Sequence, residues 1–321
     1  MFKDTISRTK MKVLILGGTG LVGKNLEEYI KTSTTISGVW TFVGSKDADL
    51  TVYEEVVNLF DKYSPTHVIN LAAYVGGLYA NLNRPVEFFT NNILININVM
   101  KASHSSVSIK KLVSILSTCI FPDNVSYPIT EEQLHLGPPH PSNEGYAYSK
   151  RMVDVLSRAY NKQYGTKYIT VIPGNLYGPF DNFNLDNSHV LPALIHKCYL
   201  AKNLNNSMVI NGTGQPLRQF TYALDLAKLL VWILENYDTE EPIILSNSEE
   251  HSITKVLDII CNTMNYKGEI LYNTEKIDGQ FKKTISTVKL QGYLDFQFTP
   301  IEEGIAKTVK WFEDNLETIR K

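Results

Sequence analysis

Tyr146 and Lys150, four residues apart in the segment YAYSK, are the residue types and the spacing that point most directly to chemistry. On a helix, residues four apart project from the same face, so the ammonium group can lie beside the phenol. A phenol with a reference pKa of about 10 is a poor proton partner near neutrality until an adjacent cation favours its ionised form. The spacing therefore predicts a proton-transfer pair, with two ordinary helix-surface residues as the alternative.

The segment GGTGLVG places Gly17, Gly20 and Gly23 at GxxGxxG spacing, directly between an apolar run and an amphipathic stretch. Glycine allows a tight turn and a close approach to a pyrophosphate, while the amides at a helix N-terminus attract phosphate oxygens. A glycine-rich turn without a ligand is the alternative, but its position at the first strand-to-helix junction favours dinucleotide binding. Lys150 can then reach the nicotinamide ribose.

The end of the second predicted strand, VGSKDAD, bears on which dinucleotide binds. NAD normally requires an Asp or Glu there to hold the ribose hydroxyls. Ser45 and Lys46 instead supply a hydroxyl and a cation, which suit a ribose 2′-phosphate. The pattern favours NADP(H), and a solvated Lys46 with Asp47 or Asp49 serving NAD is the alternative.

A third candidate group follows the strand in SILSTCIFP, which we expect to end near Ser117. Ser117 and Cys119 point to the same side if the chain is extended, and the carboxyl ends of parallel strands face the ligand crevice. A small buried hydrophobic residue is the usual role of a free cysteine. His189, in the polar loop before VLP, can present an acid opposite the thiol and so favours a catalytic Cys119.

Short runs rich in Val, Ile and Leu alternate with amphipathic stretches, from MKVLIL through VWTFVG, HVINLAA, KLVSILS and YITVIPG. This alternation predicts a doubly wound α/β fold, in which a parallel sheet is buried between two helix layers. We expect an N-terminal tail over 1–10, a Rossmann-like NADP-binding domain over 11–178 with a returning segment at about 220–247, and a smaller α/β substrate-binding lobe in the rest of 179–321. Helices are expected near 225–237 and in IAKTVKWFEDNLETI.

The composition excludes several classes of protein. Lys and Arg total 31 against 33 Asp and Glu, so the basic surface typical of nucleic-acid binding is not indicated. The longest apolar run is about six residues, short of the ~18 that span a bilayer, so we expect no membrane anchor. Cys119, Cys198 and Cys261 are scattered and odd in number, which fits a cytoplasmic, reducing compartment better than a disulfide framework. No metal ion is predicted.

The motifs together support a family resemblance. With its glycine turn and YAYSK, the chain resembles the extended short-chain dehydrogenase/reductase family, whose members modify nucleotide sugars, over nearly all of residues 11–321. STCIFP, NLAAYVGG, NLYGPFDNFN with NSHVLP, and DGQFKKT look like one subgroup of this family, in which GDP-4-keto-6-deoxy-D-mannose is epimerised and then reduced with NADPH. The resemblance implies both activities at one site, and a homodimer.

The resemblance also implies roles for particular residues. Ser117, Tyr146 and Lys150 would serve the reduction, while Cys119 and His189 would be the epimerising base and acid. The GDP end of the substrate would be bound by Lys197, Asn211, Arg218, Asp278 and Lys283. The cofactor would be contacted by Gly17, Gly20, Leu21, Val22, Gly23, Ser45, Lys46, Leu71, Ala72, Ala73, Lys150, Pro173, Gly174, Asn175, Leu176 and His189.

Two positions depart from the subgroup's pattern. Gly174 stands where Thr is usual, and Asn211 stands where Trp often precedes the glycine of WGxG. The chemistry implied for the other residues is coherent, because a ketone at C4 acidifies the hydrogens on both C3 and C5. One carbonyl would therefore permit two inversions, and its reduction would lock both.

The helix after Tyr146 is apolar over about half its circumference, wider than the ~100° stripe that one core face requires. These apolar residues are Tyr148, Met152, Val153, Val155, Leu156, Ala159 and Tyr160. A helix of a second copy can cover the surplus, and deeper burial within the same chain is the alternative.

Two other functions remain open. One is an NAD-dependent nucleotide-sugar epimerase or dehydratase that only recycles its cofactor, although dehydratases of this type carry an acidic pair where this chain has Cys119. The other is a non-catalytic, NADP-sensing Rossmann regulator, against which the combination of Ser117, Tyr146 and Lys150 argues.

Overall fold

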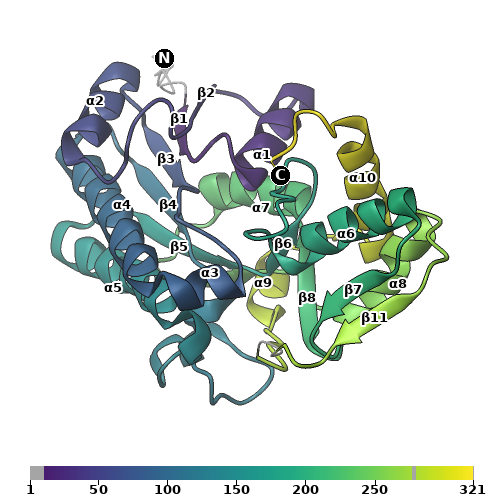
Figure 1. Ribbon diagram of the computed structural model, residues 1–321. Helices are drawn as coiled ribbons and strands as arrows, with labels where there is room; N and C mark the ends of the chain where they lie inside the picture. Colours follow the sequence, from purple (N-terminus) through teal and green to yellow (C-terminus); the bar gives the residue numbers. More distant parts are fainter. Residues whose placement is uncertain (1–10, 277–279, 321) are drawn as a thin grey trace.

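The computed structural model describes residues 11–276 and 280–320, and at its centre is a six-stranded parallel sheet (Figure 1). The strands are β1 (Lys12–Leu16), β2 (Val39–Val43), β3 (His67–Asn70), β4 (Lys111–Ile115), β5 (Tyr168–Pro173) and β9 (Ile243–Leu245). Their order is β2-β1-β3-β4-β5-β9, and each is parallel to its neighbours. The chain starts inside the sheet and winds first to one side and then to the other, which is the doubly wound arrangement predicted.

Each central strand buries side chains on both faces because helices cover both sides of the sheet. Along β1, Val13 and Ile15 belong to one apolar cluster and Leu14 and Leu16 to another, as the alternation of a strand requires. The first layer holds α1 (Leu21–Thr32) and α7 (Ala223–Asn236), and the second holds α2 (Tyr53–Tyr63), α4 (Pro85–Ser105) and α5 (Glu144–Tyr164) (Figure 1).

A second, smaller group of elements lies beside the main sheet (Figure 1). Its three-stranded sheet has the order β10-β8-β6, and two further strands, β7 and β11, pair in parallel. These strands are β6 (Asn175–Tyr177), β7 (Met208–Asn211), β8 (Leu217–Tyr222), β10 (Glu250–Ser252) and β11 (Ile270–Asn273). The helices that share its separate apolar cluster are α6 (Val190–Leu204), α8 (Ile253–Thr263) and α10 (Ile301–Asp314). Two short helices complete the fold, α3 (Leu78–Asn83) and α9 (Val288–Tyr293).

A buried lysine ties β4 to the end of α7. Lys111 is 5% exposed, and its Nζ donates to the carbonyls of Leu234 at 2.8 Å, Tyr237 at 3.1 Å and Ile233 at 3.3 Å. It also pairs with Asp238 at 2.9 Å. The last carbonyls of a helix lack intrahelical partners and carry partial negative charge, so a cation is favourable there. The buried ammonium group of Lys111 is therefore stabilised by these carbonyls and by Asp238.

The structure confirms the α/β class and all five predicted strands, which are β1 to β5, and the helix predicted near 225–237 is α7. The C-terminal helix α10 begins earlier than predicted, at Ile301 after Pro300, and it ends at Asp314. Acidic residues in its first turn suit the positive end of a helix. Within the described residues, no helix is long and apolar enough to cross a membrane. Over the same ranges, no group of three or more His, Cys, Asp or Glu side chains is arranged to hold a metal ion.

Candidate active site

A cleft of about 820 Å³ is lined by residues that follow the central strands and by residues of the second group of elements. It lies at the carboxyl ends of the strands, the edge at which open parallel sheets bind ligands. The predicted cofactor contacts in its wall are Gly17, Gly20, Leu21, Val22, Gly23, Ser45, Leu71, Ala72, Ala73, Lys150, Pro173, Gly174, Asn175, Leu176 and His189. Lys46 is exposed beside Ser45 and is not part of the wall.

The glycine turn after β1 depends on two close approaches of backbone. Gly17 has a φ of +75°, and a Cβ on it would lie 2.7 Å from the amide nitrogen of Ala72. A Cβ on Gly23 would lie 2.5 Å from the backbone of Gly18. Helix α1 starts there without a side-chain cap, which leaves its first amides available to a ligand. A turn this tight against an uncapped helix fits a pyrophosphate.

The carboxylates at the tip of β2 are engaged within their own loop. Asp47 accepts a hydrogen bond at 2.7 Å from the backbone amide three residues before it. Asp49 accepts from the hydroxyl of Thr51 at 2.7 Å and from its amide at 2.9 Å, and these bonds lower the pKa of Asp49. Ser45 lines the cleft with Lys46 next to it. This arrangement suits a 2′-phosphate better than two free ribose hydroxyls.

Helix α5 presents Tyr146 and Lys150 to the cleft. Lys150 is 2% exposed, and its Nζ donates to the carbonyl of Ile115 at 2.9 Å. Burial lowers the pKa of Lys150 to about 8. Burial also raises the pKa of Tyr146, and the neighbouring Cys119 adds to that rise. The phenol is therefore held protonated, because burial outweighs the effect expected from Lys150.

Ser117 follows β4 in extended conformation and caps a 3-10 turn over Thr118–Ile120, so Cys119 lies in that turn rather than in extended chain. The Ser117 Oγ accepts from the Cys119 amide at 3.5 Å. Ser117 lines the cleft, whereas Cys119 is 7% exposed. Burial raises the pKa of the Cys119 thiol, and the positive charges of Lys283 and Lys150 oppose this rise.

His189 comes to the cleft from the second group of elements. It is the N-cap residue of α6, and its side chain is accessible from the cleft. The protein that surrounds the imidazole still lowers its pKa by desolvation. The structure thus brings Ser117, Tyr146, Lys150 and His189 to one cleft, with Cys119 close enough for its charge to interact with Tyr146 and Lys150.

Lys283 lies close enough to Cys119 and to Arg218 to interact with their charges, and Lys283 and Arg218 are both outside the wall of the cleft. Burial lowers the pKa of Lys283, Cys119 opposes the effect, and the charge of Arg218 adds to it. Arg218 lies in β8, where its Nη1 donates to the carbonyl of Leu217 at 2.7 Å. Asp278, predicted beside these residues, lies outside the described residues.

Lys197 and Asn211 form a separate group, also outside the wall of the cleft. Lys197 lies on α6, and its Nζ donates to the carbonyl of Val209 in β7 at 3.0 Å. Asn211 is the last residue of that strand and is exposed. Burial lowers the pKa of Lys197. The described residues predicted for the GDP end therefore fall into two groups, Lys283 with Arg218 and Lys197 with Asn211.

Gly174, one of the departures from the subgroup's pattern, lies between β5 and β6. A Cβ there would lie 2.4 Å from the Oγ of Ser246 and 2.8 Å from the Oγ1 of Thr221. These hydroxyls are fully buried and 3.2 Å apart. They occupy the space that a threonine side chain at 174 would need, so Gly174 leaves room for the side chains of Ser246 and Thr221.

Among the wall residues that sequence reasoning missed, two carry charged groups, Asp181 and Arg320. Asp181 is 5% exposed, burial raises its pKa to about 7, and its Oδ2 has no hydrogen-bond partner among the described residues. The Arg320 Nη2 donates to the carbonyl of Phe180 at 2.7 Å. The motif NLYGPFDNFN contains Asp181 and offered a signal for it. Nothing near Arg320 in the sequence indicates a site, because only the fold brings it there.

The doubly wound sheet, the glycine turn and the grouping of Ser117, Tyr146 and Lys150 define a dinucleotide-dependent reductase or epimerase of the short-chain type. A model of the NAD dependent epimerase/dehydratase family matches residues 13–246. The chain belongs to this family.

Individual relatives align over the whole chain. The GDP-L-fucose synthase of Dictyostelium discoideum is 52% identical, over 99% of this chain and 100% of its own length. A probable GDP-L-fucose synthase of Drosophila melanogaster is 47% identical, over 97% of this chain and 99% of its own. The crystal structure of a GDP-L-fucose synthetase from Naegleria fowleri bound to NADP is 45% identical, with a TM-score of 0.91 over 100% of this chain and 98% of that chain.

Proposed function

We propose that this chain is an enzyme that converts GDP-4-keto-6-deoxy-D-mannose to GDP-L-fucose, by epimerising C3 and C5 and then reducing C4 with NADPH. The observation that carries the proposal is the 52% identity to a GDP-L-fucose synthase over the full length of both chains. The site supports it, because candidate groups for proton transfer and for reduction adjoin one cleft. The reaction belongs to GDP-fucose biosynthesis.

The residues of the cleft fit NADP(H). Gly17 and Gly23 keep the turn tight against α1, whose first amides would hold the pyrophosphate. Ser45 and Lys46 would hold the 2′-phosphate, since both nearby carboxylates are engaged in their own loop. Bound there, NADPH supplies the hydride for C4. The relative of known structure that holds NADP supports the same cofactor.

The epimerisation requires a base and an acid on opposite faces of the sugar. The ketone at C4 acidifies the hydrogens on C3 and C5, so Cys119 as a thiolate removes each proton in turn. Ser117 and Tyr146 donate hydrogen bonds to the C4 oxygen and stabilise the enolate. His189 returns a proton from the second group of elements, which inverts the configuration.

Burial opposes the protonation states that these roles need. Burial raises the pKa of Cys119 above 9.0, and desolvation by the surrounding protein lowers the pKa of His189 below 6.5. The substrate-free enzyme therefore holds mainly a thiol and a neutral imidazole near pH 7, and the reactive thiolate and imidazolium form is a minor population. The positive charges of Lys283 and Lys150 increase that population by stabilising the thiolate.

The reduction uses groups whose protonation states burial favours. Because burial raises the pKa of Tyr146, the phenol is protonated and can give its proton to the C4 oxygen as the hydride arrives. Ser117 holds the same oxygen. Lys150, fixed by the carbonyl of Ile115, orients the ribose beside the phenol. Loss of the ketone ends the exchange at C3 and C5.

Four described residues are proposed to bind the GDP end of the substrate, and Asp278 is proposed with them. Arg218 offers a forked donor suited to a diphosphate, and Lys283 adds a second charge close to it. Lys197 and Asn211, around β7, are proposed to contact the nucleoside.

The other two functions considered from the sequence are not favoured. An NAD-recycling epimerase or dehydratase and a non-catalytic sensor both fit the family, but the two relatives that are 52% and 47% identical to this chain are named as a GDP-L-fucose synthase and a probable one. Ser117, Tyr146 and Lys150 meet at the cleft, as a reductase requires and a sensor does not.

The decisive experiment incubates the pure protein with GDP-4-keto-6-deoxy-D-mannose and either NADPH or NADH. Loss of reduced-nicotinamide absorbance reports the reduction, and NMR identifies the sugar. We expect GDP-L-fucose, formed faster with NADPH. A reduced but unepimerised sugar would remove Cys119 and His189 from their roles, and no cofactor consumption would point to the recycling epimerase or the sensor.

Substitutions of cysteine test the proposed role of the Cys119 thiol as the base. Each acid or base typically contributes ~10²- to 10⁴-fold in rate, so Cys119→Ser should depress turnover by this order while NADPH affinity stays near that of the wild type. Cys198→Ala is the matched control, because Cys198 is a buried thiol of α6 away from the cleft. A Cys119→Ser protein with normal turnover, or one that loses only cofactor affinity, would contradict the assignment.

We also propose that the enzyme is a homodimer. The helices α4 and α5 pack side by side (Figure 1). They expose large apolar side chains, with exposed fractions of 41% at Phe89, 43% at Ile97, 39% at Met152 and 40% at Val155. A second copy of the chain, packed against α4 and α5, would cover these apolar side chains. Sedimentation should report a dimer that Ile97→Glu dissociates and Val107→Glu, at an exposed loop position, does not. A monomer at all concentrations would refute this.

We place the enzyme in the cytoplasm, since Cys119, Cys198 and Cys261 are all free thiols in the structure, as suits a reducing compartment. Fractionation of cells with an antibody against the protein tests this, and recovery from a secretory compartment would contradict it.

A further inference from the structure

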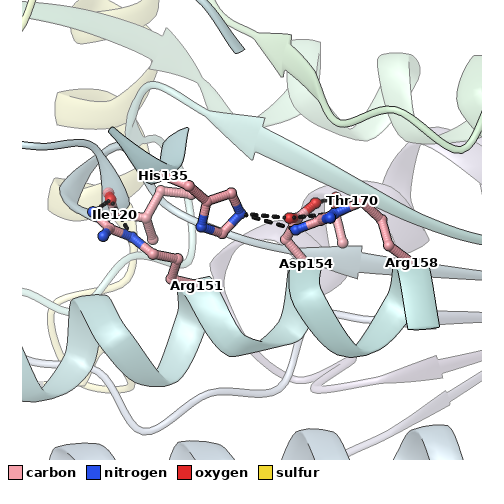
Figure 2. A network of polar contacts seen from close by, with 6 residues as sticks. All are labelled: Ile120, His135, Arg151, Asp154, Arg158 and Thr170. Carbon is pink, nitrogen blue, oxygen red and sulfur yellow. Dashed lines mark hydrogen bonds and ion pairs between the residues drawn. The ribbon is translucent and has the colours of Figure 1, made fainter. Parts of the chain in front are cut away.

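Arg151, the residue after Lys150 on α5, is a buried arginine that donates to backbone carbonyls. It is 5% exposed, and its Nε donates to the carbonyl of Ile120 at 3.0 Å. Its Nη2 donates to the same carbonyl, and its Nη1 donates to the carbonyl of Gly137 at 2.8 Å. Figure 2 shows this side chain extending toward Ile120 and away from Asp154. A side chain held by three donors at two carbonyls is rigidly fixed.

Lys150 and Arg151 bind backbone carbonyls on either side of Cys119, before the 3-10 turn and at its end. Lys150 binds the carbonyl of Ile115, at the end of β4 and before the turn. Arg151 binds the carbonyl of Ile120, the residue that follows Cys119. Consecutive residues on a helix diverge by about 100°, so two neighbours on one helix can reach two separate points. The position of the thiol relative to α5 is therefore fixed on each side.

The charge of Arg151 is not neutralised by a carboxylate. Asp154, one turn along α5, is 1% exposed and pairs instead with Arg158 at 3.0 Å and with His135 at 2.8 Å (Figure 2). Within 11–276 and 280–320, no carboxylate forms an ion pair with Arg151. Burial lowers the pKa of Arg151 and the charge of Cys119 opposes the effect, so the two groups are close enough to interact. A guanidinium stays charged in proteins even so.

We propose that Arg151 is a positioning residue for Cys119: its guanidinium fixes the turn that carries the thiol and places an unpaired positive charge close to it. The inference rests on the proposed role of Cys119 in epimerisation. The two contributions are separable by substitution. Arg151→Lys keeps a charge but lacks the planar fork that binds two carbonyls, and Arg151→Met loses both.

The test follows two quantities across a pH series. With NADP⁺ in place of NADPH no hydride is available, so deuterium incorporation from D₂O at C3 and C5, followed by NMR, reports the epimerisation alone. The rate of Cys119 alkylation by iodoacetamide, resolved by peptide mass spectrometry from Cys198 and Cys261, reports the thiolate directly. The affinity for NADP⁺ is measured alongside.

We expect Arg151→Met to slow the exchange by roughly tenfold or more. The alkylation midpoint of Cys119 in that variant should rise, because an opposite charge near the thiolate is lost. Arg151→Lys should also slow the exchange but keep its midpoint closer to that of the wild type. Both variants should bind NADP⁺ within about twofold of the wild type, since the glycine turn is untouched.

The control is Arg158→Met, which removes another guanidinium of the same helix and network but has no contact with the turn. It should leave the exchange rate and the Cys119 midpoint unchanged. An Arg151→Met midpoint equal to that of the wild type would overturn the inference, because a merely structural arginine would not move it. If Arg151→Met does not fold, Arg151→Lys decides, and wild-type exchange in that variant would overturn the inference.

The same assay separates this inference from the proposed function. If Cys119→Ser still exchanges deuterium at the wild-type rate, Cys119 is not the base and the proposed mechanism fails. If Cys119→Ser is inactive while both Arg151 variants behave as the wild type, the mechanism stands and only the role of Arg151 is refuted.

Discussion

Replacing Gly23 by alanine tests whether the cofactor turn depends on close packing. The added methyl would lie 2.5 Å from the backbone of Gly18. An ordinary contact begins at 3.4 Å, so α1 and the turn would have to separate by roughly 1 Å. Overpacking costs about 1–3 kcal/mol, which outweighs the roughly 1 kcal/mol that alanine gains over glycine inside a helix. The shift would also lengthen amide contacts to the pyrophosphate, and losing one such hydrogen bond, at about 1.5–3 kcal/mol, weakens binding about ten- to hundredfold.

The melting temperature of the ligand-free protein and the dissociation constant of NADPH, from a fluorescence titration, measure the two effects. Gly20→Ala is the matched control, because its methyl would meet only the carbonyl oxygen of Gly17, at 3.4 Å. We expect the control to melt as the wild type does. Gly23→Ala should melt lower, by about 2–4 °C for each kcal/mol lost, and bind NADPH roughly tenfold or more weakly. A Gly23→Ala protein that matches the wild type in both measurements would refute the packing argument.

Three more results are expected. Lys111→Met should lower the free energy of unfolding in urea by about 1–3 kcal/mol, since it strips the last carbonyls of α7 of their buried cation, and an unchanged midpoint would contradict this. Because the pKa of Cys119 is raised above 9.0 and that of His189 is lowered below 6.5, the acid limb of deuterium exchange should lie at a pH below 6.5, where the minor thiolate is protonated, and the alkaline limb at a pH above 9.0, where the imidazolium deprotonates. Between these limits exchange should decline only partly, as Lys150 loses its charge near pH 8; a full limb inside this window would exclude the assignment. Gly174→Thr should destabilise by about 1–3 kcal/mol, and adding Ser246→Gly should recover part of that loss in the same urea titration; a stable single variant would show that the space is free.

The sequence was sufficient for five of the six strands of the central sheet, all but β9, and for the turn after β1. Strands buried on both faces read as short continuous apolar runs, so MKVLIL and KLVSILS were distinguishable from the amphipathic helices between them. The spacing of Gly17, Gly20 and Gly23 marked the turn, and at Gly17 and Gly23 the close approach of other backbone requires glycine. Tyr146 and Lys150 share one turn of α5, so their meeting at the cleft needed no tertiary information.

Features that depend on tertiary contacts could not be predicted from the sequence. Cys119 lies in a 3-10 turn rather than extended chain, because the Oγ of Ser117 accepts from its amide and Arg151 binds the next carbonyl. The protonation of Tyr146 depends on the protein packed around the phenol, not on the lysine four residues away. Arg320 reaches the cleft only because its segment pairs with the loop around Asn182.

The wall of the cleft contains residues as distant in the sequence as Gly17 and Arg320. A ligand that touches both acts as a non-covalent cross-link between the Rossmann-type sheet and the second group of elements. At a hundredfold excess over its dissociation constant such a ligand stabilises the folded chain by about 2.7 kcal/mol. Proteolysis should therefore slow in both groups at once when NADP(H) is added, and the supply of cofactor sets the lifetime of the folded protein as well as its turnover.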